Sequence, residues 1–195
     1  MEGLDGFRQS GGQPRESGLS RGGGRGILTR PRVGVSACLL GQAVRYDGDS
    51  RPHAWICDVL PGFVEIVPFC PETGAGLGVP RPAVHLVKDG GTVRLLGVSN
   101  SELDVTMVLK QWIRQQEPLL QKLDALVFKA RSPSCGLDST PLYDRNGVLL
   151  SARASGIYAD WVRRRFPAML LSDDVELESE RQQKDFLRRL GVHGV

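Results

Sequence analysis

Long apolar runs are missing from this sequence of 195 residues. No stretch approaches the roughly 18 apolar residues of a membrane span, and none near the N-terminus has the roughly 7–15 apolar residues of a secretory signal. These absences exclude membrane-spanning proteins and make the cytoplasm the expected location. Cysteine is scarce, with four residues. Because the cytoplasm is reducing, we expect metal ligands or reactive thiols rather than disulfides.

A charge excess is also missing from most of the chain. Residues 33–195 carry nineteen basic and nineteen acidic side chains, so this part has no overall attraction for a phosphate backbone. The formal charge of +3 lies in residues 1–32, which hold six arginines and three acids. Residues 1–30 are rich in Gly, Arg and Ser, and we expect a disordered arm there. That arm is expected to contact nucleic acid only weakly, and residues 31–195 are expected to form one domain.

Buried strands and helices alternate along the expected domain. Strands are predicted at residues 32–36, 63–67, 124–129 and 168–171, and helices at 53–60, 104–123, 155–166 and 176–190. Turn residues predict two hairpins, one over 83–98 and a smaller one over 142–150, with loops over 37–52, 68–83 and 130–141. This order predicts an α/β fold: a single Rossmann-like domain with a mostly parallel sheet and a small β-hairpin insertion. No internal repeat is visible.

Three of the four cysteines follow predicted strands. Cys38, Cys70 and Cys135 come after the first, second and third strand respectively. Since the carboxyl ends of parallel strands meet at one crevice, we expect these thiols to converge. Three thiolates suit a soft metal or an iron–sulfur cluster, and a missing fourth ligand leaves a coordination position open. Cys57 lies in an apolar helical stretch, and we interpret it as core packing.

Four motifs surround these cysteines in a fixed order. They are SACLLG with VRYDG, VPFCPETGAGLGVPRP, ELDVT and KARSPSCG, and an acidic stretch with an amphipathic helix follows at Leu177–Leu190. Together they resemble the thiouracil desulfidase family over residues 31–190. The resemblance implies a 4Fe–4S cluster on Cys38, Cys70 and Cys135, with one iron free of protein ligands. It also implies non-redox desulfuration of a small thiolated nucleobase, with hydrosulfide as product. The arm has no counterpart in the family.

Candidate catalytic residues lie in the same motifs. The resemblance places the acid and the hydroxyl of the cleft on Glu72 and Ser132. A carboxylate such as Glu72 can activate water for attack on the thiocarbonyl carbon, and Ser132 can hydrogen-bond the substrate or relay a proton. Asp47 is the next candidate base, although an ion pair between Arg45 and Asp47 would explain both residues equally well.

Several alternatives stay open at the level of sequence. Glu72 can instead cap a turn, and Ser132 and Ser134 can instead satisfy loop amides, so either serine is a candidate for the site. A zinc-binding structural module would need a fourth ligand from Cys57 or His53. The other rivals are a nucleic-acid adaptor that works through the arm and an enzyme with Cys135 as nucleophile.

Overall fold

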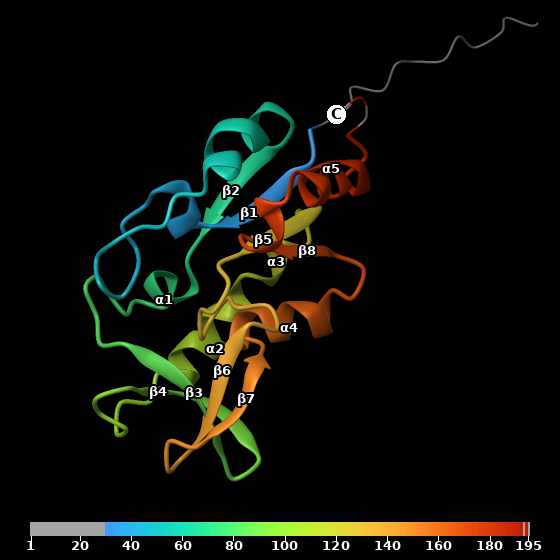
Figure 1. The fold of residues 1–195 in the computed structure, drawn as a ribbon. Helices are drawn as coiled ribbons and strands as arrows, with labels where there is room; N and C mark the ends of the chain where they lie inside the picture. Colours follow the sequence, from blue (N-terminus) through green and yellow to red (C-terminus); the bar gives the residue numbers. More distant parts are fainter. Residues whose placement is uncertain (1–29, 193, 195) are drawn as a thin grey trace, which may run out of the picture.

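A four-stranded parallel sheet lies at the centre of the computed structural model, which describes residues 30–192 and 194 (Figure 1). Its strands stand in the order β2-β1-β5-β8, and each neighbouring pair is parallel. The strands are β1 (Arg32–Ser36), β2 (Glu65–Phe69), β5 (Ala125–Phe128) and β8 (Leu170–Asp173). The predicted mostly parallel α/β fold is therefore confirmed. The predicted arm, apart from Arg30, lies outside the described residues.

The order of the strands creates a switch point beside β1. The chain passes from β1 to β2 on one side and later enters β5 on the other side. The connections on the two sides of β1 therefore diverge at its carboxyl end. In open α/β sheets this divergence opens a crevice in which ligands bind.

Both faces of the central sheet are covered, which explains why β5 is apolar at every position. Leu126 and Phe128 belong to one core cluster, with buried residues of α2 (Thr106–Gln115) and α4 (Ile157–Arg165). Ala125 and Val127 belong to the other, with Phe186 and Leu187 of α5 (Glu180–Arg189). All four β5 side chains are buried, as expected for a parallel strand between two layers.

The two predicted hairpins join into a second sheet. They consist of β3 (Val84–Asp89) with β4 (Thr92–Gly97), and β6 (Thr140–Asp144) with β7 (Leu149–Ala154). Parallel pairing of β3 with β6 connects them in the order β4-β3-β6-β7, which the sequence did not predict. Asp89 also links the hairpins, because its carboxylate pairs with Arg94 at 3.1 Å and with Arg145 at 2.6 Å.

Two predicted strands begin later than expected because turns use their first residues. The N–H groups of Phe63 and Val64 both donate to the Leu60 carbonyl, so β2 starts at Glu65. The N–H of Met169 donates to Phe166 in the same way, and β8 starts at Leu170. The prediction of loop throughout 68–83 was wrong in two places, since residues 68 and 69 end β2 and α1 (Pro71–Gly74) follows. Proline fits in β2 because that strand is at a sheet edge.

The helices in the structure are shorter than the helices predicted from the apolar patterns. The segment predicted as one helix over 104–123 is divided into α2 and α3 (Glu117–Leu120), with Pro118 in the first turn of α3. Residues 53–60 contain a π-helical turn, Trp55–Val59, followed by a 3-10 turn, Leu60–Gly62. The C-terminal segment begins with a 3-10 turn at Glu176–Glu178 before α5.

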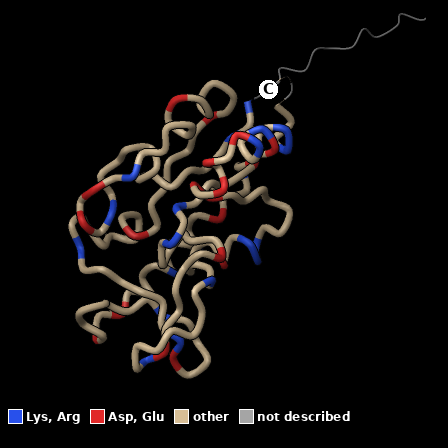
Figure 2. Tube along the Cα trace, in the orientation of Figure 1, with Lys and Arg blue, Asp and Glu red and all other residues tan. Residues whose placement is uncertain are grey.

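Charged residues of both signs are spread over the described part of the chain, in line with its balanced composition (Figure 2). No helix within residues 30–192 combines the length and apolarity needed to cross a membrane.

Candidate functional site

The three cysteines that follow predicted strands meet at the carboxyl edge of the central sheet. Cys38 lies in a 3-10 turn, Ala37–Leu40, directly after β1, and Cys70 follows β2 as the residue before α1. Cys135 lies in the loop after β5. All three line one cavity of about 500 Å³. The convergence expected from the strand ends is therefore present in the structure.

Burial and mutual repulsion both act on these thiols. Burial raises the pKa of Cys38 to about 11, and the neighbouring Cys70 thiol is the next largest cause. Burial also raises the pKa of Cys135 well above its usual value, followed by the charges of Cys70, Cys38 and Glu72. The thiols are thus close enough for each charge to act on the next. Three thiolates in this position need a positive centre to stabilise them.

The loop before Cys135 is held by its own hydroxyl group. Ser132 Oγ accepts hydrogen bonds from the N–H groups of Cys135 at 3.1 Å and Ser134 at 3.3 Å. The N–H of Gly136 donates to the Ser132 carbonyl at 2.7 Å. These bonds fix the direction in which the loop presents Cys135 to the cavity.

Cys57 lies apart from the three cavity cysteines. It does not line the cavity, and its Sγ donates to the Leu39 carbonyl oxygen at 3.2 Å. All four cysteines are free thiols. Within residues 30–192, no group of three or more His, Cys, Asp or Glu side chains is arranged to hold a single metal ion. Three cysteines that line one cavity, each from a different loop, are the ligand type that iron–sulfur clusters use.

Among the residues that the structure describes, Glu72 is the one acidic residue that lines the cavity, and its carboxylate is held from both sides. Its Oε2 accepts a hydrogen bond from Nε of Arg81 at 2.8 Å and forms an ion pair with Nη2 of the same guanidinium at 2.8 Å. Its Oε1 accepts a hydrogen bond from Ser134 Oγ at 2.8 Å. Both members of the ion pair are nearly buried, with side-chain exposures of 6% for Arg81 and 11% for Glu72. The contacts fix the orientation of a charged carboxylate beside the cysteines.

The two candidate serines occupy different places. Ser132 lines the cavity, whereas Ser134 is fully buried and does not line it. Ser134 is the residue that contacts the carboxylate of Glu72. Ser132 therefore lies on the cavity side of the loop, and Ser134 lies against Glu72.

Asp47 lies beside the cavity rather than in its lining. Its carboxylate accepts hydrogen bonds from Arg45 Nε at 3.1 Å and Nη2 at 2.8 Å. The hydrogen bond with Arg45 is the largest cause that lowers the pKa of Asp47, to about 2. Arg45 lines the cavity, so Asp47 is connected to the site only indirectly, through its hydrogen bonds with the Arg45 guanidinium.

Basic side chains, most of them in ion pairs, line much of the rest of the cavity, and the sequence did not predict this. The basic residues that line it are Arg45, Arg51, Arg81, Lys129 and Arg131. Lys129 pairs with Asp174 at 2.7 Å at the carboxyl end of the sheet. The motif VRYDG contains Tyr46, which also lines the cavity and was not predicted as a site residue from the sequence. Tyr46 stands between Arg45 and Asp47 in one short motif, and this position was the sequence signal that it belongs to the site.

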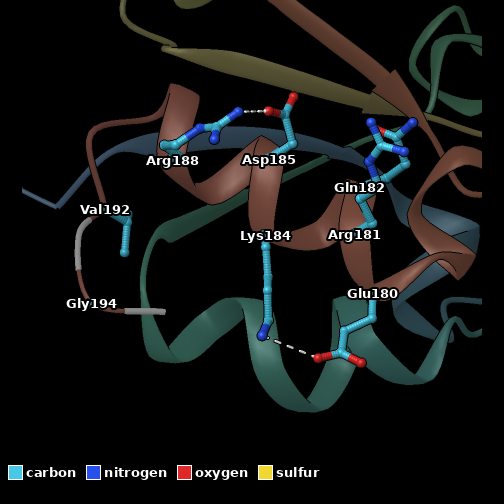
Figure 3. A pocket seen from close by; sticks show the side chains of 8 residues that line it. All are labelled: Glu180, Arg181, Gln182, Lys184, Asp185, Arg188, Val192 and Gly194. Carbon is cyan, nitrogen blue, oxygen red and sulfur yellow. Dashed lines mark hydrogen bonds and ion pairs between the residues drawn. The ribbon is translucent and has the colours of Figure 1, made fainter.

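A larger cavity of about 900 Å³ lies along α5 and has a different character (Figure 3). Its lining is formed by charged surface side chains of α5, such as the Lys184–Glu180 pair at 3.1 Å, together with residues of the C-terminal segment. It contains none of the four cysteines. Its size therefore does not make it the candidate site.

Comparison with known proteins gives a family match and a similar solved structure. Residues 33–174 match the family model described as 2-thiouracil desulfurase. A solved structure of TudS, described as a 4Fe–4S-dependent thiouracil desulfidase, superposes with a TM-score of 0.62 at 29% sequence identity. The match covers 84% of this chain and 99% of that chain. A search of curated proteins gives no match. With the family match spanning most of its length, this chain belongs to the 2-thiouracil desulfurase family.

Proposed function

We propose that this protein removes sulfur from a thiolated pyrimidine base, and that Cys38, Cys70 and Cys135 hold a 4Fe–4S cluster for this reaction. The observation that carries the proposal is the convergence of three free thiols from three strand ends on one cavity, with Cys38 and Cys135 buried and Cys70 partly exposed. The similarity to a 4Fe–4S-dependent thiouracil desulfidase supports it.

The donor set fits a cluster with three protein ligands. Each of the three cysteines comes from a different loop, and Cys38 and Cys135 are in reach of the charge on Cys70. When bound, such a cluster supplies an iron without a protein ligand, which is a Lewis acid suited to the soft sulfur of a thiocarbonyl group.

The reaction needs water but no oxidant or reductant. Water adds its oxygen to the thiocarbonyl carbon, the carbon–sulfur bond breaks, and the sulfur leaves as hydrosulfide with one proton released. We infer that Glu72 orients this water and accepts its proton. A carboxylate offers about four acceptor positions, and the hydrogen bonds from Arg81 Nε and Ser134 Oγ occupy two of those on Glu72. Oε2 also forms the ion pair with Nη2 of Arg81, whereas Oε1 accepts one hydrogen bond and keeps an acceptor position for water in the cavity.

Ser132 complements Glu72 as a hydrogen-bond donor. Its oxygen already accepts two backbone N–H groups, so its hydroxyl proton is available to a ligand. We infer that this proton is donated to the base as negative charge develops there in the transition state. Asp47 contributes by holding Arg45 rather than by contact with the reacting atoms.

The other hypotheses from the sequence receive less support. No set of ligands for a single ion lies within residues 30–192, which does not favour a zinc module. The raised pKa of Cys135 favours its thiol form when no metal is bound, which does not favour a cysteine nucleophile.

Hydrosulfide release tests the proposed reaction directly. Protein purified without oxygen is incubated with 2-thiouracil or 4-thiouracil, and uracil and hydrosulfide are quantified. We expect equal amounts of the two products without added reductant. Turnover that depends on a reductant would contradict the non-redox reaction. Absence of turnover on both bases would contradict the proposal that the substrate is a thiobase.

A further inference from the structure

The turn over Val44–Asp49 places an exposed aromatic side chain at the cavity, and the proposed chemistry does not use it. Tyr46 lines the cavity and is 44% exposed. The other aromatic residue in the lining is Phe69. The ring of Phe69 packs edge-on against Phe128 and Tyr158, with centroid distances of 5.9 Å and 5.3 Å, and so belongs to the core. Tyr46 is therefore the aromatic lining residue whose ring is open to a ligand.

The turn that carries Tyr46 is closed by its neighbours. The Asp47 carboxylate holds the Arg45 guanidinium through two hydrogen bonds and accepts a third from the N–H of Asp49 at 3.2 Å. Gly48 has a φ of +78°, and its N–H donates to the Arg45 carbonyl at 3.0 Å. A residue with a side chain is disfavoured at that φ, so the tight turn explains the glycine.

Arg45 also fixes the aromatic ring. Its guanidinium lies over the Tyr46 ring, 5.6 Å from the centroid. A cation at this distance is attracted to the electron-rich face of the ring. Because Asp47 already holds the guanidinium, the ring has a preferred position before any ligand binds, while the residue stays 44% exposed.

A further contact connects the backbone of Tyr46 to the carboxylate of Glu72. The backbone N–H of Arg81 donates to the Tyr46 carbonyl at 2.9 Å, and the Arg81 side chain pairs with Glu72. Arg81 Nη1 also donates to the Val44 carbonyl at 3.0 Å. The backbone of the turn that carries Tyr46 is thus connected to Glu72 through a single residue.

We propose that Tyr46 is the stacking platform for the pyrimidine ring of the substrate, with Arg45 supporting the opposite face of the tyrosine. This inference rests on the proposed function. Stacking recognises the flat ring and not its sulfur. We therefore expect that uracil, like a thiobase, binds here. Discrimination for sulfur then comes from the cysteine side of the cavity.

Equilibrium dialysis of labelled uracil against the iron-loaded protein tests the platform without requiring turnover. Loss of base–aromatic stacking in Tyr46→Leu should weaken uracil binding about tenfold, whereas Tyr46→Phe should bind within about twofold of wild type. Iron content should be equal in all variants. Tyr143→Leu is the matched control, because Tyr143 packs beside His85 on the second sheet and does not line the cavity.

Kinetics on a thiobase give a second readout. Tyr46→Leu should raise KM about tenfold and leave kcat within about threefold, since stacking binds substrate and transition state alike. Unchanged uracil binding in Tyr46→Leu, or a loss in Tyr46→Phe as large as that in Tyr46→Leu, would overturn the platform. If the Tyr46 variants give those results while the wild type releases hydrosulfide, the proposed function stays intact. A wild type that releases none would contradict the proposed function itself, and uracil dialysis would still report on Tyr46.

Discussion

At the scale of single residues, the site depends on side chains that are held before a ligand arrives. Glu72 is fixed by Arg81 and Ser134, and Arg45 is fixed by Asp47. Lys129 is fixed by Asp174. Groups that are already oriented need no reorganisation when charge develops on a substrate, which is the main way in which polar sites lower a reaction barrier.

Glu72→Gln tests the acceptor role of the carboxylate. The change keeps the shape of the side chain and removes its charge, so hydrosulfide release should fall by about 10²–10⁴-fold. Thermal stability should also fall, because the nearly buried Arg81 loses its counter-charge. Rates must therefore be normalised to folded, iron-loaded protein. Near-normal release after that correction would assign Glu72 to a structural role and return Asp47 to consideration as the base.

The two serines should separate into one catalytic and one supporting residue. Ser132→Ala removes a donor that faces the cavity and should lower hydrosulfide release by about tenfold, the effect of roughly 1.4 kcal/mol. Ser134→Ala removes the buried hydrogen bond to Glu72 and should reduce the unfolding free energy by about 0.5–1.5 kcal/mol, with release within about threefold. Parallel assays and denaturant titrations check both. The reverse order of rate losses would contradict the assignment of Ser132 to the ligand space.

At the scale of elements, the loop that carries Cys135 is packed against the start of α4. The N–H of Gly156 donates to the Gly136 carbonyl at 2.8 Å, and the N–H of Tyr158 donates to the Ser134 carbonyl at 2.9 Å. A Cβ on Gly156 would stand 2.5 Å from the carbonyl atoms of Ser134 and 2.8 Å from the Cys135 nitrogen. The close approach of these two backbones leaves no room for a side chain.

Gly156→Ala should therefore move the Cys135 loop. We expect it to lower the unfolding free energy by about 1–3 kcal/mol, as overpacking does elsewhere, and to reduce the iron bound per chain. Gly62→Ala is the matched control, since its Cβ would meet no atom within 4 Å and its φ is not positive. Denaturant titration and iron analysis of both variants give the comparison. Equal iron content in the two would show that the loop adapts.

Element order and the meeting of the cysteines could be predicted because both follow from local patterns. Buried apolar runs identified the strands, and parallel strands bring their carboxyl ends together. Contacts between distant segments could not be predicted, because no local pattern encodes them. The bond from Ser134 to Glu72 joins residues 62 positions apart, and the pairing of β3 with β6 joins two hairpins that each look complete alone. Tyr46 was missed for the same reason, since its exposure at the cavity depends on the fold.

At the scale of the whole molecule, the cavity is built from one continuous part of the chain. Its lining residues fall between Ser36 and Cys135, and the family match begins at residue 33. Residues 1–29 lie outside the described residues and outside that match. We therefore propose that the arm is not required for the reaction.

Removal of residues 1–29 checks this proposal and retains Arg30, whose guanidinium donates to the Pro61 carbonyl. Turnover of a thiobase should stay within about twofold of the full chain, a change in barrier below roughly 0.5 kcal/mol. Steady-state assays on both proteins at equal iron content give the ratio. A tenfold loss would show that the arm contributes to the site or to substrate delivery.

The most direct measurement for the account as a whole is iron content and hydrosulfide release in four single cysteine variants, each purified without oxygen. Wild type is expected to bind about four iron atoms with sulfide and to show the absorption of a cubane cluster. Cys38→Ala, Cys70→Ala and Cys135→Ala should each lose the cluster and the release of hydrosulfide from 2-thiouracil. Cys57→Ala should keep both, because its thiol donates to Leu39 and does not line the cavity. A full cluster in any of the first three variants, or its loss in Cys57→Ala, would contradict the proposed ligand set.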